Sequence, residues 1–324
     1  MGIEDVLNMY RSDLLEVERW MLANLTSEVK LIAEVGGHII GGGGKRIRPL
    51  MLLSVAAACG GGQEARYPLA AVIEFIHTAS LLHDDVIDNA ETRRGRVSAN
   101  HIWGNQASIL VGDYLYARSF DLMTQYGNQR VIKCLARATT AMAEGEVFQL
   151  TKVGDIGISE ADYLKIIEGK TAVLISAACE IGAIIGGAGE EEINRFARFG
   201  YATGMAFQIV DDALDYTAKE ENLGKSLGKD LAEGKITLPL ICALSRGTGD
   251  EKERVKEIIR KSTRDESDFR WIKGFIDNHE GIAYAMKRAR DFIEEAKQNL
   301  PPLSPSPAVS ALYLLADYIV LRGN

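Results

Sequence analysis

Proline is scarce in this chain of 324 residues, and where it is missing is informative. Only seven prolines occur, and none lies between Pro68 and Pro239. Proline breaks helix interiors, whereas the Ala, Leu, Ile, Glu and Met residues that fill this interval favour helices. Alternating patterns typical of strands are absent, and apolar residues recur at helical spacing, as in Leu69, Val72, Ile73 and Ile76. The sequence therefore predicts an all-α protein, with no linker or repeat that would divide residues 1–324 into separate domains.

The helices are predicted from these apolar patterns. They are expected over residues 3–24, 27–39, 48–60, 66–88, 104–126, 129–150, 160–185, 190–218, 236–245, 250–262, 267–277, 280–298 and 307–321. Several are apolar on more than one face, which is typical of helices inside a large bundle. Ser306-Pro307 provides a capping residue and a first-turn proline for the last helix.

Other scarcities exclude whole classes of function. The four cysteines are far apart in the sequence, so no zinc-ligand spacing is present. No window of 18 residues is apolar and free of charge, which argues against a transmembrane helix. The net charge of −8 argues against nucleic acid as a partner, because phosphate backbones require a basic surface. We expect a soluble, cytoplasmic protein.

Two acidic clusters follow long apolar helices. They are Asp84-Asp85-Val86-Ile87-Asp88 and Asp211-Asp212-Ala213-Leu214-Asp215. Acids four residues apart share a helix face and repel each other, and a helix C-terminus also disfavours anions. Mg²⁺ would offset both effects, because it binds carboxylate and phosphate oxygens. One such cluster alone can be a solvated helix end, but two copies predict metal ions that hold one diphosphate from both sides.

Basic residues gather in Gly-rich segments near these clusters. Gly41-Gly42-Gly43-Gly44-Lys45-Arg46-Ile47-Arg48-Pro49 joins four glycines, which allow close backbone approach, to cations at a helix N-terminus, which attracts anions. Thr92-Arg93-Arg94-Gly95-Arg96 follows the first cluster, and guanidinium groups bind phosphate in a fork geometry. Leu223-Gly224-Lys225 and Gly234-Lys235 follow the second cluster and could close over phosphates. The first loop on its own could equally be flexible, with solvated charges.

Lys170 and His77 each allow two interpretations. Lys170 lies in an otherwise apolar helix, so it either reaches the surface or contacts a ligand, since an unpaired buried charge is costly. His77 precedes Asp84 by two helical turns and points roughly the same way. It is either a core histidine or a hydrogen-bond partner of a diphosphate oxygen.

These segments resemble the trans-isoprenyl diphosphate synthase (polyprenyl synthetase) family. The matching pieces run in the family's order over roughly residues 30–240, from Gly43-Gly44-Lys45-Arg46-Ile47-Arg48-Pro49 to Gly234-Lys235. The resemblance implies the isoprenoid synthase fold, with about a dozen helices around a central cavity, and a homodimer. It also implies a prenyltransferase that condenses an allylic diphosphate with isopentenyl diphosphate and releases diphosphate. The implied cofactor is Mg²⁺, as three ions for which Mn²⁺ can substitute.

The same resemblance implies roles for individual residues. Metal binding falls to the aspartates, most directly Asp84, Asp88 and Asp211 and also Asp215, with Asp85 and Asp212 in support. The residues for isopentenyl diphosphate would be Lys45, Arg48, His77 and Arg94. Those for the allylic diphosphate would be Arg93, Lys170, Thr171, Gln208, Lys225 and Lys235.

The helix before the first cluster predicts product length. One helical turn of about 5.4 Å matches roughly one isoprene unit. Residues four, five and eight places before Asp84 would therefore act as successive floors of the cavity, and they are Ser80, Ala79 and Ile76. Short-chain members of the family often carry an aromatic residue at the first two places, and this chain has none. Further candidate floors on the following helices are Met123, Tyr126 and Leu135.

The stretch Ile73 to Asp85 looks most like the long-chain branch of the family, which makes quinone side chains. We expect a product of about C30 to C50 (octaprenyl, C40, is the best single guess), farnesyl diphosphate as primer and transient membrane contact for product release. The alternatives are a shorter-chain synthase, a class I terpene cyclase, which would not need a second diphosphate site, and a non-catalytic subunit, which would usually lack some of the six aspartates. A membrane prenyltransferase is excluded by the lack of spanning helices.

Overall fold

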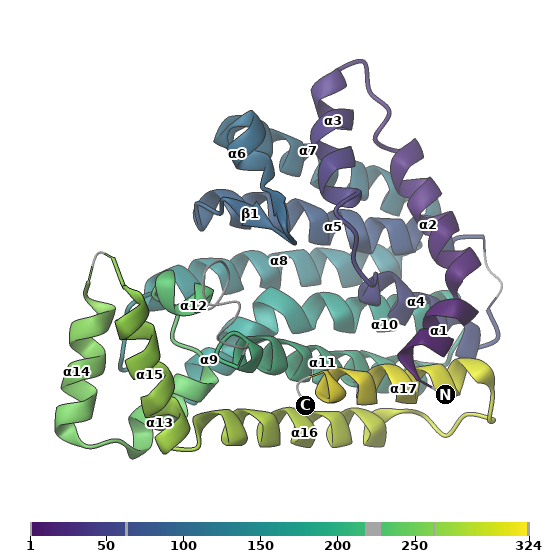
Figure 1. Cartoon of the computed structure of the whole chain (residues 1–324). Coiled ribbons are helices and arrows are strands. Elements are labelled where there is room, and N and C mark those ends of the chain that lie inside the picture. The colour runs from purple at the N-terminus through teal and green to yellow at the C-terminus, as the bar shows by residue number, and fades with distance from the viewer. Residues whose placement is uncertain (1, 62–63, 218–227, 262, 323–324) are drawn as a thin grey trace. The chain divides into compact units, whose positions relative to one another are not determined.

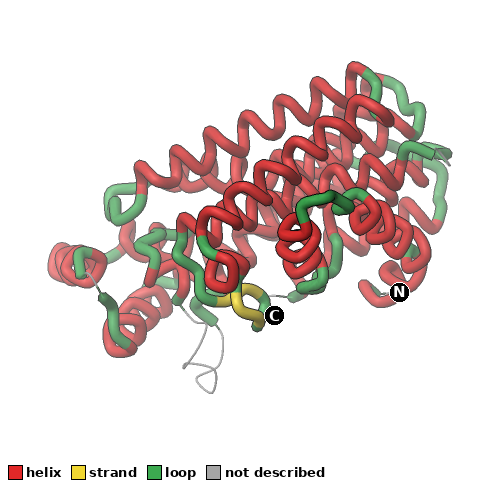
Figure 2. Tube along the Cα trace, turned by 90° about the horizontal axis from the view of Figure 1, so that it is seen from above, coloured by secondary structure: helices red, strands yellow, loops and turns green. Residues whose placement is uncertain are grey.

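A computed structural model describes residues 2–61, 64–217, 228–261 and 263–322. Helices make up most of this part of the chain, and one short hairpin is its strand structure (Figure 2). The expected all-α fold is confirmed. Among the described residues, no helix has the length and apolar character that crossing a membrane would require.

The chain divides into two compact units. Unit 1 comprises residues 1–139, 174–197 and 301–314, and unit 2 comprises residues 140–173, 198–300 and 315–324. The boundaries fall inside helices, because α8 (Gln129–Lys152), α10 (Val173–Ile185), α11 (Glu190–Leu214) and α17 (Pro307–Leu321) each have residues in both units.

Unit 1 is built around one long buried helix, α5 (Arg66–Ile87), which packs against α7, α4 and α2 (Figure 1). Every residue from Leu69 to Ile76 is buried, including Glu74, so α5 is covered on all faces, as its largely apolar sequence predicts. The other elements are α1 (Ile3–Met9), α2 (Arg11–Ala23), α3 (Lys30–Ile40), α4 (Ile47–Ala58), β1 (Thr92–Arg93), β2 (Arg96–Val97), α6 (Ala99–Trp103) and α7 (Asn105–Tyr126).

In unit 2, α13 packs against both α15 and α16. The elements of unit 2 are α9 (Glu160–Ile167), the π-helix η1 (Glu168–Ala172), α12 (Lys229–Ala232), α13 (Leu238–Arg246), α14 (Gly249–Ile259), α15 (Glu266–Asn278) and α16 (Gly281–Asn299). Capping boxes fix the first turns of α9, α14 and α15 through Ser159, Thr248 and Asp265.

The structure differs from the expected elements at several places. The predicted helix over 3–24 is broken at Tyr10, whose side chain is buried. The segment after the first acidic cluster forms the β1–β2 hairpin, whose turn residues Arg94 and Gly95 both have positive φ, 52° and 76°. That turn is usually signalled by Asn-Gly, so arginine in its first position hides the hairpin from sequence analysis.

The predicted helix over 160–185 is interrupted by the π-helix η1. Here Gly169 lies against Gly145 of α8, and a Cβ atom on Gly145 would be 2.8 Å from the Gly169 Cα. A pair of glycines therefore allows two backbones to meet at the turn that carries Lys170 and Thr171. π-Helical turns inside α-helices occur frequently at functional sites.

Candidate active site

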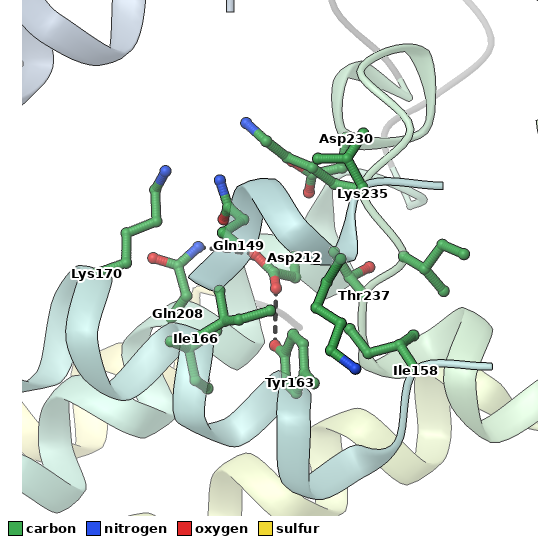
Figure 3. A pocket seen from close by; sticks show the side chains of 14 residues that line it. Gln149, Ile158, Tyr163, Ile166, Lys170, Gln208, Asp212, Asp230, Lys235 and Thr237 are labelled. Atoms are coloured by element: carbon green, nitrogen blue, oxygen red, sulfur yellow. Dashed lines mark hydrogen bonds between the residues drawn. The ribbon is translucent and has the colours of Figure 1, made fainter. Parts of the chain in front are cut away.

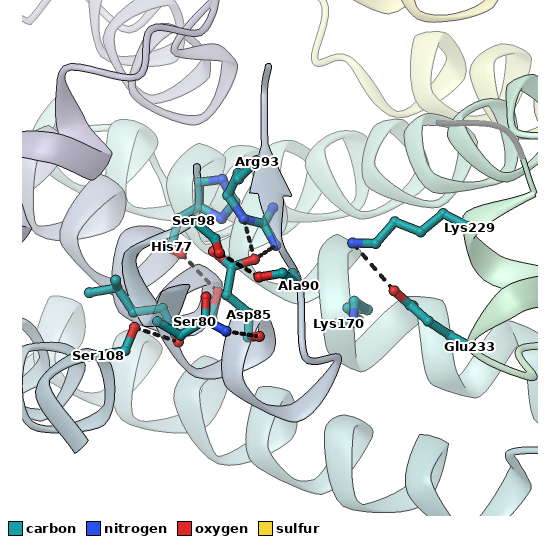
Figure 4. A network of polar contacts seen from close by, with 12 residues as sticks. His77, Ser80, Asp85, Ala90, Arg93, Ser98, Ser108, Lys170, Lys229 and Glu233 are labelled. Atoms are coloured by element: carbon teal, nitrogen blue, oxygen red, sulfur yellow. Dashed lines mark hydrogen bonds and ion pairs between the residues drawn. The ribbon is translucent and has the colours of Figure 1, made fainter. Parts of the chain in front are cut away.

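The first acidic cluster ends α5, as predicted. Asp84 and Asp85 lie in its last turn, and Asp88 is the capping residue, whose backbone N–H donates to the Asp84 carbonyl at 2.8 Å. Asp84 and Asp85 are both buried. Asp85 Oδ1 accepts a hydrogen bond from Arg93 Nε at 2.7 Å and forms an ion pair with Arg93 Nη2 at 2.6 Å (Figure 4). Its second oxygen, Oδ2, is buried and has no hydrogen-bond partner in the described chain, which leaves it available to a cation.

The β1–β2 hairpin brings two predicted cations to this cluster. Arg93 is paired with Asp85, while Arg94 Nη1 donates to the carbonyl of Gly43 in the Gly-rich loop. Asp85, Arg93, Arg94 and Gly42 line one cavity of unit 1. The structure thus joins the Gly-rich loop, the hairpin and the first cluster at one place, although they are separate in the sequence.

His77 lies half-buried on α5 among the same arginines (Figure 4). Burial, followed by the charges of Arg48, Arg94, Arg93 and Arg46, holds the pKa of His77 well below its usual value of 6.5. The imidazole is therefore neutral at neutral pH. A neutral imidazole can still donate one N–H to a phosphate oxygen.

The other two cations that were predicted to bind isopentenyl diphosphate, Lys45 and Arg48, lie around the start of α4. Lys45 is exposed in the loop, and Arg48 is half-buried in the first turn of the helix. The N-terminus of a helix favours anions, so both side chains reinforce a place suited to phosphate.

The second acidic cluster ends α11. Asp211 and Asp212 lie in its last turn, and Asp215 follows one residue after its end. Asp211 Oδ1 pairs with Arg322 Nη2 at 2.9 Å. Asp215 accepts the backbone N–H groups of Lys229 at 3.3 Å and Asp230 at 3.1 Å, so the start of α12 fixes this carboxylate.

Asp212 is held by a chain of hydrogen bonds (Figure 3). Thr171 Oγ1 donates to Gln208 Oε1 at 2.6 Å, Gln208 Nε2 donates to Asp212 Oδ1 at 2.7 Å, and the Tyr163 hydroxyl donates to Asp212 Oδ2 at 2.7 Å. Burial raises the pKa of Asp212 to about 7; the two hydrogen bonds lower it, and Asp211 and Asp215 raise it further. A nearby cation would restore the charged form.

A cavity in unit 2 collects three of the six residues predicted for the allylic diphosphate, whereas Arg93 lines the cavity in unit 1. Lys170, Gln208, Asp212, Asp230 and Lys235 are among the residues that line the cavity in unit 2 (Figure 3). Both lysines pair with glutamates, Lys170 Nζ with Glu146 at 3.1 Å and Lys235 Nζ with Glu233 at 2.6 Å. A diphosphate bound here would compete with these carboxylates for the lysines. Lys225 lies outside the described residues.

Three residues of the site, Tyr163, Asp230 and Arg322, were not predicted from the sequence. Tyr163 and Arg322 are isolated in the sequence, so only the tertiary structure shows that they contact the second cluster. Asp230 does have a local signal, because it lies in the same Gly-rich segment as the predicted cation Lys235. Burial, followed by the charges of Asp212 and Asp215, raises the pKa of Asp230 well above its usual value.

These residues suit a hard divalent cation. Carboxylate oxygens dominate both clusters, and the buried, unpartnered Oδ2 of Asp85 is a ready ligand. Within the described ranges, no three acidic, histidine or cysteine side chains converge to hold a metal by themselves. Mg²⁺ is usually bound through one or two carboxylates, with phosphate and water oxygens completing its shell. The acids therefore fit metal ions that arrive together with a diphosphate.

An all-helical fold with acidic helix ends, each beside fixed cations, defines a class of enzyme that acts on diphosphates with the help of a divalent metal. A match to a known protein family shows which kind of enzyme within this class the chain is. The model of the family described as Polyprenyl synthetase matches residues 29–275, and the chain belongs to this family. It is a polyprenyl diphosphate synthase, a prenyltransferase.

Similar proteins support this assignment over the full length. An octaprenyl diphosphate synthase of Haemophilus influenzae is 40% identical over 100% of this chain and 98% of its own. A decaprenyl diphosphate synthase from Rhodobacter capsulatus has a TM-score of 0.94 at 42% identity, covering 99% of both chains. A polyprenyl synthase from Caulobacter crescentus, complexed with calcium and isoprenyl diphosphate, has a TM-score of 0.94 at 40% identity, covering 100% of this chain and 99% of that one.

Proposed function

We propose that this enzyme makes a long all-trans polyprenyl diphosphate of about C30 to C50, with octaprenyl (C40) as the most favoured product. It would extend an allylic primer, farnesyl diphosphate, by repeated addition of isopentenyl diphosphate. The observation that carries the proposal is the absence of an aromatic side chain at Ala79 and Ser80, one turn before Asp84. An aromatic ring at either place would end the cavity after a short chain.

The surroundings of α5 support this proposal. Ala79 and Ile76 are fully buried on α5, and Met123 of α7 and Leu135 of α8 are buried in the same unit. Each added isoprene unit gains up to about 4 kcal/mol by burial of five carbons at roughly 0.8 kcal/mol each. Extension therefore continues until a side chain blocks it. The octaprenyl and decaprenyl synthases to which this chain is similar fit a long product.

The proposed chemistry needs no nucleophilic side chain. Ionisation of the allylic C–O bond leaves a diphosphate anion, and Lys170, Arg93 and Lys235 are the cations proposed to stabilise it. His77, as a neutral N–H donor, and Lys45, Arg48 and Arg94 would orient isopentenyl diphosphate, whose double bond attacks the allylic cation. Apolar surroundings exclude water, which would otherwise capture that cation. The departing diphosphate is the proposed acceptor of the final proton.

The proposed metal is Mg²⁺, as three ions, bound by Asp84, Asp88, Asp211 and Asp215. When bound, it neutralises charge on the diphosphate during ionisation. Asp85 and Asp212 would support these ligands. Asp85 is held by Arg93 through Oδ1 and offers only Oδ2 to a cation, and Asp212 has both oxygens bound by Tyr163 and Gln208.

We also propose a homodimer. Ile109, Leu110 and Phe120 of α7 are large apolar side chains that are exposed, Leu110 by 66%, and a second copy of the chain could cover them. Light scattering of the purified enzyme tests this: the mass of a dimer is expected, and the mass of a monomer would contradict it.

Product sizing tests the proposed chain length. The purified enzyme is incubated with Mg²⁺, farnesyl diphosphate and labelled isopentenyl diphosphate, and the products are separated by length. A product that stops at C15 or C20 would contradict the long-chain proposal and favour a shorter-chain synthase. Failure to consume isopentenyl diphosphate would favour a cyclase instead. Ala79→Phe is expected to shorten the product, and an unchanged length would show that this face of α5 does not line the cavity.

A further inference from the structure

Arg46 is the middle cation of the Gly-rich loop, and its position differs from that of its neighbours. Lys45 is exposed and Arg48 half-buried, whereas only 6% of the Arg46 side chain is exposed. Arg46 therefore points away from solvent and into unit 1. A buried guanidinium must be paired, because an uncompensated charge inside a protein is strongly unfavourable.

The partner of Arg46 is Glu74 of α5. Nη1 of Arg46 donates to Glu74 Oε1 at 2.7 Å, and only 5% of the Glu74 side chain is exposed. Nη2 donates to the carbonyl of Ile40, the last residue of α3, at 2.6 Å. One planar group thus joins the end of α3 to α5, which a lysine could not do with a single nitrogen in the same geometry.

The backbone at Arg46 is unusual as well. Arg46 has φ 48° and ψ 43°, the left-handed conformation that residues other than glycine rarely adopt, and it is the capping residue from which α4 starts. Its carbonyl accepts the N–H of Leu50 at 2.9 Å. The fixed side chain and this backbone conformation together set the direction in which the chain enters α4, and therefore the directions of Lys45 and Arg48.

The other side of the loop is fixed by Arg94. Its guanidinium contacts the carbonyl of Gly43, and a Cβ atom on Gly44 would be 2.7 Å from Arg94 Nη1. Gly44 also has a φ of 137°, so it has neither the space nor the conformation for a side chain. The loop is held between the hairpin arginine on one side and the buried pair on the other.

Glu74 also lies one turn before His77 and ten residues before Asp84 on the same helix. A helix is a rigid spacer, so a contact at Glu74 places the loop at a fixed distance from both residues. We propose that Arg46 and Glu74 are positioning residues, whose buried ion pair fixes the Gly-rich loop on α5 so that Lys45 and Arg48 face the same isopentenyl diphosphate as His77. This rests on the proposed function of Lys45, Arg48 and His77.

The test compares Glu74→Gln with Glu18→Gln. Both variants remove one carboxylate charge from the same guanidinium, but Glu18 Oε1 is 3.4 Å from Arg46 Nε and its side chain is 42% exposed. The Michaelis constants for isopentenyl diphosphate and farnesyl diphosphate are measured separately for each variant, together with kcat. Glu74→Gln is expected to raise KM for isopentenyl diphosphate about tenfold or more and to change KM for farnesyl diphosphate less than about threefold. Glu18→Gln should leave both constants unchanged.

Arg46→Lys provides a second variant. It keeps the positive charge but loses the two nitrogens that contact Glu74 and the Ile40 carbonyl, and it should show the same selective rise in KM for isopentenyl diphosphate. If KM for isopentenyl diphosphate is unchanged, or if both constants move together, the pair is only structural and the proposal is wrong. If circular dichroism shows that both variants fail to fold, the pair serves stability and the proposal is again overturned.

Lys45→Ala separates this proposal from the proposed function. If Lys45→Ala leaves KM for isopentenyl diphosphate unchanged, the assignment of this loop to that substrate fails. If Lys45→Ala raises it while Glu74→Gln does not, the assignment stands and only the positioning role fails.

Discussion

Asp212 and Asp215 of the second cluster are held in place by different kinds of hydrogen-bond donor. Both oxygens of Asp212 already accept hydrogen bonds, from Gln208 and from Tyr163. Asp215 is instead fixed by backbone N–H groups at the start of α12. A carboxylate whose oxygens are bound by neutral donors keeps its orientation before any metal arrives, and preorganisation of this kind reduces the cost of binding.

Replacement of Tyr163 by phenylalanine should therefore weaken metal binding while the core remains filled. The variant keeps the buried ring and removes the hydroxyl that donates to Asp212 at 2.7 Å. A hydrogen bond to a charged group contributes about 1.5–3 kcal/mol, so kcat/KM should fall about 10- to 100-fold. The Mg²⁺ concentration for half-maximal rate, and the affinity for Mn²⁺ measured by electron paramagnetic resonance, should show weaker metal binding.

Tyr284→Phe is the matched control, because its hydroxyl donates to another carboxylate, Glu160 Oε2, at 2.6 Å. It should leave metal binding as it is in the wild type. Equal effects of the two substitutions would show that Tyr163 has no special relation to the metal site.

His77 makes a pH-dependent contribution to stability. Its pKa in the folded protein is well below the usual 6.5, so below about pH 6.5 the unfolded chain binds a proton that the folded chain does not. The free energy of unfolding should then fall as the pH decreases, by up to about 1.4 kcal/mol per pH unit relative to His77→Asn. Urea unfolding of both proteins from pH 5 to pH 8 measures this difference. Parallel curves would mean that the imidazole is protonated as easily in the folded state as in the unfolded one.

At the scale of elements, the contact between α8 and η1 is set by a pair of glycines. A Cβ atom on Gly169 would be 2.8 Å from Gly145 Cα and 2.9 Å from the Ala141 carbonyl. Gly169→Ala should therefore push the two backbones apart and destabilise the protein by about 1–3 kcal/mol. Because Lys170 and Thr171 follow directly, KM for the allylic diphosphate should rise as well, and steady-state kinetics measures it.

Gly274→Ala in α15 is the control for this substitution. No atom lies within 4 Å of the Cβ that it would add. Alanine stabilises a helix interior by roughly 0.5–1 kcal/mol relative to glycine, so this variant should be slightly more stable. If Gly169→Ala behaves in the same way, the close approach is not needed for the π-helix.

Most elements, but few of the contacts around the site, could be predicted from the sequence. Helices follow from apolar periodicity and from the long interval without proline, and both acidic clusters were correctly placed at helix ends. The β1–β2 hairpin has only two residues per strand, too few for an alternating pattern. The π-helix η1 depends on the Gly145–Gly169 contact, which is distant in sequence. The partners of the acids, Tyr163 and Arg322, are likewise chosen by tertiary structure.

At the scale of the whole molecule, an acidic protein has to bind two anionic substrates. The net charge is −8, so long-range attraction does not assist binding and local cations must supply it. In unit 1 the candidate cations lie in two short segments, residues 45–48 and 93–96. In unit 2, two of the lysines that line the cavity, Lys170 and Lys235, are paired with glutamates. This arrangement favours a diphosphate that arrives with its charge partly neutralised by metal.

Thermal unfolding tests that interdependence of metal and diphosphate. Mg²⁺ together with inorganic diphosphate should stabilise the protein by about 2.7 kcal/mol when the ligand is at 100 times its dissociation constant. Either component alone should give a much smaller rise in Tm, and EDTA should reverse the effect and abolish activity. A full rise with diphosphate in the presence of EDTA would show that the cations of the chain suffice.

The single helix α5 carries Glu74, Ile76, His77, Ala79 and Asp84 within three turns. An engineer who wants a different product would be drawn to Ala79 and Ile76. Any substitution that shifts α5, however, also displaces the proposed metal-binding acids and Glu74, the proposed anchor of the basic loop. Yield and length would then change together in a screen. Libraries at Met123 and Leu135, on other helices, should let chain length vary while turnover is preserved.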